Sequence, residues 1–240
     1  METIFIKLFN MSIAASWLIL VVILLRLLLR KAPKSLCCIL WALVGIRLIC
    51  PFSFESVLSL IPSAETVSPN ILYSETPTIS SGIDIVNSTV NPVITESLAP
   101  QVEASVNPLQ IVVYVMSIVW LGGIAAMLLY SVLSYVYLCR KVATAVLLRD
   151  NIWQSEKVSS PFVLGLFRPR IYIPFSTDAD GMQYVIAHEA AHIQRHDHWI
   201  KPLGFLILTV YWFNPLVWLA YTLLCRDIEL ACDERVIKEL

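Results

Sequence analysis

Three long apolar runs dominate the pattern of hydrophobic and polar positions along the chain. They cover about residues 8–29, 35–49 and 109–138. The first and third reach the roughly 20 apolar residues that a helix needs to cross a bilayer, whereas the second is marginal and contains Arg47. We therefore expect a multi-pass α-helical membrane protein, with two membrane helices and a short turn in residues 1–51 and a third helix in residues 108–139.

Composition agrees with this pattern, and the charges orient it. The chain is 58% hydrophobic and only 15% charged, which takes it out of the soluble class. Arg30, Lys31 and Lys34 follow the first run, so the positive-inside rule places this turn in the cytoplasm and the N-terminus outside the cell membrane. The lipid bilayer is then a partner of the chain. No basic block is long enough to indicate direct binding of nucleic acid.

Residues 52–107 differ in composition from the rest of the chain. They contain no Lys or Arg and are rich in Ser, Thr and Pro, which predicts a mostly irregular extracytoplasmic loop. Arg140 and Lys141 follow the third apolar run, so we expect residues 140–240 to lie in the cytoplasm.

All four histidines of the chain lie between residues 188 and 198. His188 and His192 are four residues apart, which places both imidazoles on one face of a helix, where they can bind one Zn²⁺ ion. Glu189 follows the first histidine, where its carboxylate can act as a general base on water. This H-E-x-x-H motif predicts a zinc metalloendopeptidase with one Zn²⁺ per chain. The alternative is a chance motif on a solvated helix.

A catalytic zinc ion needs a third protein ligand, and the sequence offers two candidates. His198 lies ten residues after His188, but enzymes with a histidine at this spacing need glycine for a sharp turn, and this chain has Arg195 there. Glu229 is the preferred candidate. Asp233 lies four residues later on the same expected helix, where it can accept the N–H of a ligand imidazole.

The choice of Glu229 constrains the path of residues 199–225. This segment is apolar and about long enough to cross a bilayer, which would separate Glu229 from His188. Asn214-Pro215 interrupts it, because proline removes a backbone donor and obstructs a continuous helix. We therefore expect a re-entrant or interfacial helical hairpin that returns Glu229 to the metal.

Short segments before the zinc motif predict strands, at residues 151–157, 161–164 and 170–173. Prolines flank the last of them, which suggests an edge strand that binds an extended peptide substrate through backbone hydrogen bonds. Its residues are Arg170, Ile171, Tyr172 and Ile173. Alternatively, the sheet only packs against the zinc helix. The expected fold of residues 140–240 is thus a small cytoplasmic α+β, zincin-like metalloprotease module that includes the hairpin.

Taken together, these segments resemble a known family. The segments that carry the resemblance are residues 160–166, 168–174, 188–192, 195–197, 212–216 and 229–234. They are similar to the antirepressor metalloproteases, the membrane peptidase modules of bacterial β-lactam-sensing signal transducers of penicillinase and methicillin-resistance regulation. The resemblance covers essentially the whole chain. It implies a gluzincin-type site, with His188, His192 and Glu229 as zinc ligands, Glu189 as general base and Asp233 supporting a ligand.

The resemblance also implies a role in signal transduction. Its members cleave a DNA-binding transcriptional repressor, and self-cleavage belongs to the same pattern. The sequence departs from the family pattern because it ends at Leu240 with no S-x-x-K sensor, so we expect either a part of a longer chain or a relative with another input, and β-lactam sensing does not carry over. Two other functions stay open: a membrane quality-control or prenyl-protein-type zinc protease, and a non-enzymatic membrane signalling scaffold.

Overall fold

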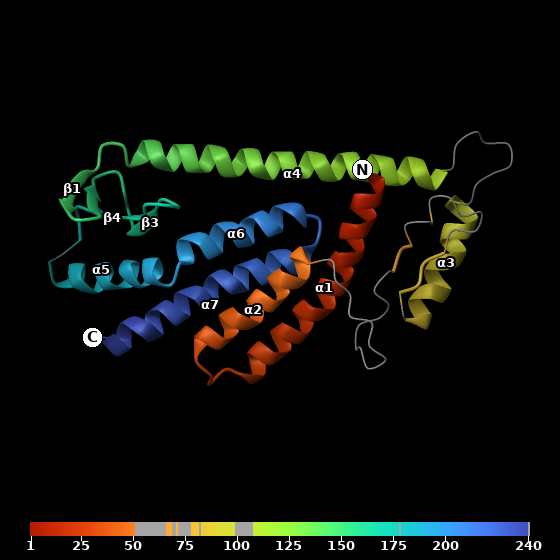
Figure 1. The fold of residues 1–240 in the computed structure, drawn as a ribbon, viewed down its shortest axis with the longest axis horizontal. Helices are drawn as coiled ribbons and strands as arrows, with labels where there is room; N and C mark the ends of the chain where they lie inside the picture. Colours follow the sequence, from red (N-terminus) through yellow and green to blue (C-terminus); the bar gives the residue numbers. More distant parts are fainter. Residues whose placement is uncertain are drawn as a thin grey trace. The chain divides into compact units, whose positions relative to one another are not determined.

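The structure is a computed structural model that describes residues 1–50, 66–68, 71, 78–81, 83–98, 108–177 and 179–239. The elements follow in the order α1 (Glu2–Leu28), α2 (Lys34–Ile49), α3 (Asp84–Leu98), α4 (Pro108–Lys141), β1 (Val146–Arg149), β2 (Ile152–Ser155), β3 (Phe162–Leu164), β4 (Arg170–Pro174), α5 (Ala179–Gln194), α6 (Asp197–Val210) and α7 (Pro215–Glu239) (Figure 1). The described residues are mostly helical and include one small sheet, in agreement with the coarse fold class expected from the sequence.

The chain divides into two compact units. The first comprises Met1–Leu28, Ala42–Ala125 and Tyr211–Val217, and the second comprises Leu29–Trp41, Ala126–Val210 and Trp218–Leu240. Helices α2, α4 and α7 therefore contribute residues to both units. The candidate site lies entirely in the second unit.

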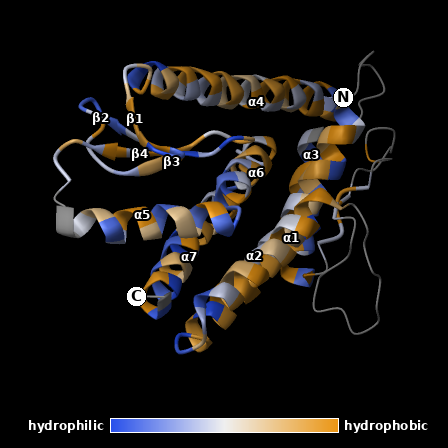
Figure 2. Ribbon diagram, turned by 60° about the vertical axis from the view of Figure 1, so that its left-hand side comes forward, coloured by the Kyte–Doolittle hydropathy of each residue, from blue (hydrophilic) through white to orange (hydrophobic). Residues whose placement is uncertain are grey.

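Helices α1 and α4 are long and apolar enough to cross a membrane, with 27 and 34 residues. The apolar side chains of α4 are largely uncovered by protein: Val115 is 50% exposed and Leu129 is 60% exposed. Figure 2 shows hydrophobic colours along most of this helix. Large exposed apolar surfaces are rare on soluble proteins, so α4 supports association with a membrane. Helix α2 has 16 residues, which is short for a bilayer crossing.

In the first unit, polar side chains hold the connection between α6 and α7 against α1. Asn214 Nδ2 donates hydrogen bonds to the hydroxyl oxygens of Ser12, at 2.7 Å, and Ser16, at 2.8 Å. Asn214 Oδ1 also accepts the backbone N–H of Leu216 at 2.9 Å, so Asn214 caps α7 directly before Pro215. The helix break expected at Asn214-Pro215 is therefore present. The resulting hairpin consists of α6 and α7.

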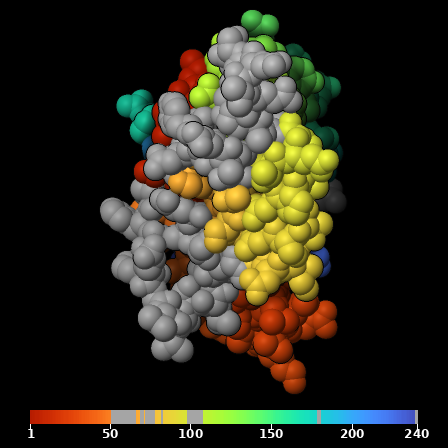
Figure 3. Space-filling model, turned by 90° about the vertical axis from the view of Figure 1, so that its right-hand side faces the viewer, coloured from red at the N-terminus to blue at the C-terminus, as the bar shows by residue number. Residues whose placement is uncertain are grey.

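The expectation of a mostly irregular segment over residues 52–107 is wrong for its described part, because α3 occupies Asp84–Leu98. Asn91 donates to the carbonyl oxygen of Ile79 at 3.1 Å and accepts the N–H of Ile79 at 2.8 Å. These contacts fix α3 on the preceding chain, and residue composition alone does not reveal them. Figure 3 shows the side chains of α3 in yellow on the surface, and none of residues 84–97 is buried. Residues 51–65 and 99–107 lie outside the described part.

The sheet in the second unit has the strand order β1-β2-β4-β3. Strand β2 pairs with β4 in parallel, and the outer pairs β1–β2 and β3–β4 are antiparallel. One face of the sheet packs against α5 through Ile152, Ile171 and Ile173, together with α5 residues such as Val185. The sheet therefore supports the helix that carries the histidine motif.

The prediction that residues 170–173 form an edge strand is wrong. Strand β4 is an inner strand, because Tyr172 pairs with Trp153 of β2 on one side and with Phe162 of β3 on the other. Pro169 and Pro174 lie at the ends of β4, where a missing N–H does not interrupt the ladder between them. Among the described residues, the outer strands are β1, which the sequence did not predict, and β3.

Helix α7 carries Glu229 and Asp233, and two contacts with α2 fix it within the second unit. The indole N–H of Trp41 donates to Asp227 Oδ2 at 2.8 Å, and Asp227 is 1% exposed. The backbone N–H of Lys34, at the start of α2, donates to Glu234 Oε2 at 2.9 Å. Glu234 thus caps α2 from another helix, and α7 is positioned on both sides of Glu229.

Candidate metal centre

Helix α5 presents His188 and His192 on one face, as their spacing predicts. The Nε2 atoms of the two imidazoles lie 3.2 Å apart. Glu229 reaches the same point from α7: its Oε2 atom lies 3.3 Å from His192 Nε2 and 3.7 Å from His188 Nε2. The fold thus brings together three potential metal-ligating atoms, although Glu229 lies 41 residues after His188 in the sequence.

The three separations fit a single metal ion. Ligand atoms that lie 2.0–2.2 Å from a tetrahedral zinc ion are separated from one another by about 3.3–3.6 Å. The observed values of 3.2, 3.3 and 3.7 Å fall close to this range. The donor set of two imidazoles and one carboxylate is also the set that binds catalytic zinc. The residues present therefore fit a zinc ion.

Cys232 is a competing donor, because its Sγ and the ring nitrogens of His188 and His192 lie within 4.8 Å of one another. The thiol is fully buried and donates to the backbone carbonyl oxygen of His188 at 3.4 Å. It packs with Ala191 and Val236 between α5 and α7. Cys232 is thus directed toward the backbone of α5, whereas Glu229 Oε2 faces both Nε2 atoms.

Two aspartates lie beside the other ring nitrogens of the histidine pair. Asp197 Oδ2 lies 2.8 Å from His192 Nδ1, and Asp197 is 1% exposed. Asp233 Oδ1 lies 3.2 Å from His188 Nδ1, although the geometry is not that of a hydrogen bond. A carboxylate that accepts the Nδ1–H leaves Nε2 free to bind metal. Asp233 therefore lies beside a candidate ligand imidazole, without the hydrogen bond that the sequence predicted.

Asp197 lies in the cluster although it was not among the candidate residues predicted from the sequence. It comes directly after the turn that ends α5, where His196 adopts a positive φ of 61°. This turn reverses the chain direction so that Asp197 meets His192, five residues earlier. An acid shortly after an H-E-x-x-H motif was the available signal, but the turn geometry was needed to use it.

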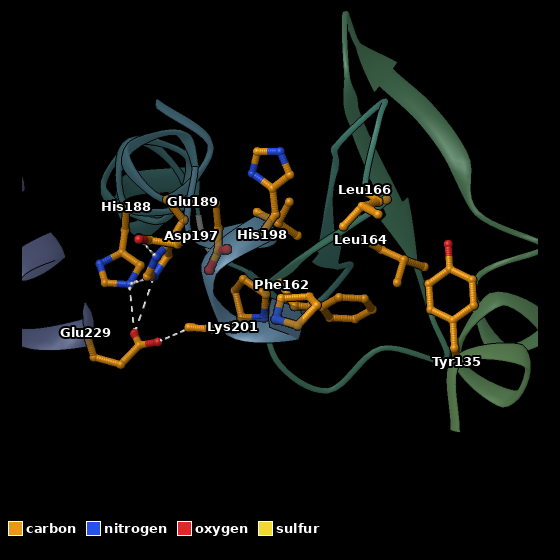
Figure 4. A pocket seen from close by; sticks show the side chains of 15 residues that line it. Tyr135, Phe162, Leu164, Leu166, His188, Glu189, Asp197, His198, Lys201 and Glu229 are labelled. Atoms are coloured by element: carbon orange, nitrogen blue, oxygen red, sulfur yellow. Dashed lines mark hydrogen bonds and ion pairs between the residues drawn. The ribbon is translucent and has the colours of Figure 1, made fainter. Parts of the chain in front are cut away.

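His198, the alternative third ligand, does not join the histidine pair. Its ring points away from His188 in Figure 4. Its nearest aromatic neighbours are His196, with ring centres 6.0 Å apart, and Trp199, at 6.4 Å. The pKa of His198 is lowered by burial and by the neighbouring His196. The structure therefore places Glu229, and not His198, beside the two imidazoles.

The charged groups of the cluster shift one another's pKa values. Burial lowers the pKa of His192, but its hydrogen bonds with Asp197, Cys232 and Glu229 outweigh burial and raise the pKa to about 11. The hydrogen bond with His192 lowers the pKa of Glu229 to about 2, against burial and with help from Lys201. Lys201 Nζ lies 2.6 Å from Glu229 Oε1, a contact that the sequence did not suggest. One carboxylate oxygen of Glu229 thus faces Lys201, and the other faces the imidazoles.

Glu189 lines the same pocket and is 9% exposed. Burial raises the pKa of its carboxyl group, and the nearby His192 and His188 partly offset this effect. A carboxylate whose pKa is raised toward neutrality binds a proton more readily than an exposed one, which suits a general base.

The pocket around this cluster has a volume of about 400 Å³. One wall carries His188, Glu189, Lys201 and Glu229, and the opposite wall is apolar (Figure 4). The apolar wall consists of Tyr135 from α4, Pro161, the β3 residues Phe162, Val163 and Leu164, and the following Gly165 and Leu166. None of the described lining residues comes from β4, so the expected substrate strand at residues 170–173 does not border the metal cluster. Strand β3 does.

Comparison with known families places this chain among the peptidases. The matching family model is described as BlaR1 peptidase M56 and covers residues 6–240, so the chain belongs to this family. This membership confirms the resemblance found in the sequence.

Individual relatives match a smaller part of the chain. Regulatory protein BlaR1 of Bacillus licheniformis is 38% identical over 90 residues, which are 36% of this chain and 15% of the relative. Methicillin resistance mecR1 protein of Staphylococcus aureus (strain Mu50 / ATCC 700699) is 30% identical over 94 residues, which are 38% of this chain and 16% of the relative. The matched part thus spans about a sixth of the length of these relatives.

Proposed function

We propose that this protein is a membrane-bound zinc endopeptidase of signal transduction. The observation that supports this function best is the convergence of His188 Nε2, His192 Nε2 and Glu229 Oε2 within 3.7 Å of one another. Membership of a peptidase family supports hydrolysis of a peptide bond. In this proposal His188, His192 and Glu229 hold the zinc ion, and Asp197 and Asp233 orient the two imidazoles.

Glu189 is the general base of the proposed reaction. When bound, Zn²⁺ supplies a Lewis acid that lowers the pKa of water and polarises a peptide carbonyl. The buried carboxylate of Glu189 accepts a proton from the attacking water and then donates it to the leaving amine. Asp197, the Nδ1 partner of His192, stays in place during both steps, because it is buried and hydrogen-bonded in the resting site.

The proposed binding site for the substrate backbone is the outer edge of β3, and not the strand at residues 170–173. Phe162, Val163 and Leu164 line the pocket that contains Glu189, and β3 is an outer strand among the described residues. An extended peptide can therefore pair with this edge while its backbone passes the metal. The proposed substrate is a cytoplasmic protein, such as a transcriptional repressor, or the peptidase itself. The names of the two relatives, a regulatory protein and a methicillin resistance protein, favour a role in regulation.

The proposed topology follows the charge distribution. The N-terminus lies outside the bacterial cell, residues 1–51 and 108–139 cross the membrane, and residues 52–107 lie outside. Residues 140–240 form a zincin-like module in the cytoplasm, with the hairpin at 199–225 dipping into the membrane or lying on it. Labelling of single cysteines at positions 84 and 157 with a membrane-impermeant reagent tests this orientation. Position 84 should react in intact cells, and position 157 only after lysis.

Glu189→Gln tests the enzymatic function. The variant should retain one zinc ion per chain and lose peptide cleavage, because the amide keeps the shape of the side chain but cannot accept the proton. Retained cleavage would refute the role of Glu189. Zinc-free wild-type protein without peptidase activity would favour the signalling scaffold. Cleavage of many unfolded membrane proteins would favour the quality-control or prenyl-protein-type protease.

A further inference from the structure

A second cavity adjoins the pocket of the candidate metal centre. Its volume is about 450 Å³, and it shares Tyr135, Leu164 and Gly165 with the first pocket. Trp153 and Tyr172 also line it, and both belong to the sheet face opposite to the one that packs on α5. A chain that follows β3 past the metal cluster can therefore place side chains in this second cavity.

The second cavity is positively charged. Arg168 and Arg170 line it, and its lining includes no carboxylate. The Cζ atom of Arg170 lies 4.9 Å from the ring centre of Trp153, which holds the guanidinium over the indole. Among the described residues, neither arginine forms an ion pair. Two arginines without an acidic partner create a positive potential that an incoming carboxylate can neutralise.

The two guanidinium groups are presented by well-defined backbone. Gly165 has a φ of +113°, and a Cβ atom there would lie 2.5 Å from the carbonyl oxygen of Arg168, so only glycine permits this turn between β3 and β4. Arg170 pairs with Leu164 in the sheet, and paired residues project on the same face. A peptide added to the free edge of β3 would lie two strand spacings, about 10 Å, from the β4 backbone. Two long side chains can meet across that distance.

We propose that this second cavity, the arginine subsite formed by Arg168, Arg170, Trp153 and Tyr172, binds an acidic side chain of the substrate. The inference rests on the proposed endopeptidase function and adds a rule of specificity: an Asp or Glu lies within a few residues of the cleaved bond. Arginine is suited to this task because its planar guanidinium binds a carboxylate through two parallel hydrogen bonds.

The test uses the full chain with bound zinc, reconstituted in phosphatidylcholine nanodiscs. A proteome-derived peptide library is digested, and cleavage sites are mapped by mass spectrometry. We expect Asp and Glu to be enriched at one position near the cleaved bond. The double variant Arg168→Glu/Arg170→Glu should lose this enrichment and favour Lys or Arg there, with kcat/KM for an acidic peptide reduced about tenfold or more. Arg168→Gln should give a smaller loss.

Arg149→Glu provides the matched control. Arg149 is an exposed arginine of β1 that lies 3.7 Å from Asp150 and lines neither cavity, so this variant should keep the wild-type preference. Cleavage without any acidic preference, or a preference that survives the double reversal, overturns the subsite and leaves the endopeptidase function standing. Absence of all cleavage refutes the endopeptidase function itself. If the double variant differs from the wild type only when anionic phosphatidylglycerol is added, the arginines bind lipid headgroups, and the proposal is overturned.

Discussion

Replacing Asp197 by asparagine should weaken zinc binding without unfolding the site. Asp197 is 1% exposed, and its Oδ2 atom lies 2.8 Å from His192 Nδ1 and 3.5 Å from Arg195 Nε. An asparagine keeps the volume and can accept one hydrogen bond, but it removes the negative charge that raises the basicity of the imidazole. Loss of such a partner typically lowers metal affinity by about 10–100-fold. This range corresponds to about 1.4–2.7 kcal/mol of binding free energy.

Asp233→Asn is the matched comparison. Asp233 also lies beside a ligand imidazole, but its side chain is 44% exposed, and its contact with His188 Nδ1 at 3.2 Å lacks hydrogen-bond geometry. We therefore expect Asp233→Asn to change zinc affinity less than Asp197→Asn. The assay is competition for zinc with a chromophoric chelator in detergent, with circular dichroism to verify folding. Equal affinity in wild type and Asp197→Asn, or a larger loss in Asp233→Asn, would refute the reasoning.

Three further changes have defined outcomes in thermal unfolding. Gly123→Ala should lower stability by about 1–3 kcal/mol, because its Cβ would lie 2.1 Å from the Trp212 ring, whereas Gly122→Ala meets nothing within 4 Å and should be neutral. Equal effects would contradict this packing. Removing zinc should lower Tm, because free zinc at 100 times Kd adds about 2.7 kcal/mol to the free energy of unfolding. The Tm of the His188→Ala variant should not change when zinc is added or removed. Trp41→Phe removes the indole donor to Asp227 and should cost about 1–3 kcal/mol, against little change for the partly exposed Trp17→Phe.

The sequence predicted the features that depend on runs of apolar residues and on the spacing of residues close together in the chain. The apolar runs at 8–29 and 109–138 form α1 and α4, and the i, i+4 spacing places the two imidazoles together because both lie within the single helix α5. The helix break at Asn214-Pro215 also follows from local chemistry, because proline excludes a donor and asparagine caps the next helix. These features need no knowledge of the remaining chain.

The errors concern contacts between distant segments. Prolines at both ends of β4 suggested an edge strand, but whether another strand pairs on each side depends on where β3 and β2 lie, which no local pattern determines. Helix α3 was missed because Asn91 exchanges hydrogen bonds with the backbone of Ile79, twelve residues earlier. Lys201 was missed because its partner Glu229 comes from another helix.

The turn after α5 decides which of the residues that follow it can approach the histidine pair. The metzincin arrangement uses glycine after the motif to turn a third histidine back to the metal. In this chain the turn is made by His196, whose φ of 61° is unusual for a residue with a side chain. It directs Asp197 to His192 and leaves His198 at the pocket wall. The same turn can bring either a carboxylate to the Nδ1 atom of a ligand imidazole or a third histidine to the metal. In this chain the turn serves Asp197, and the proposed third ligand is Glu229, which α7 brings to 3.3 Å from His192 Nε2 and 3.7 Å from His188 Nε2.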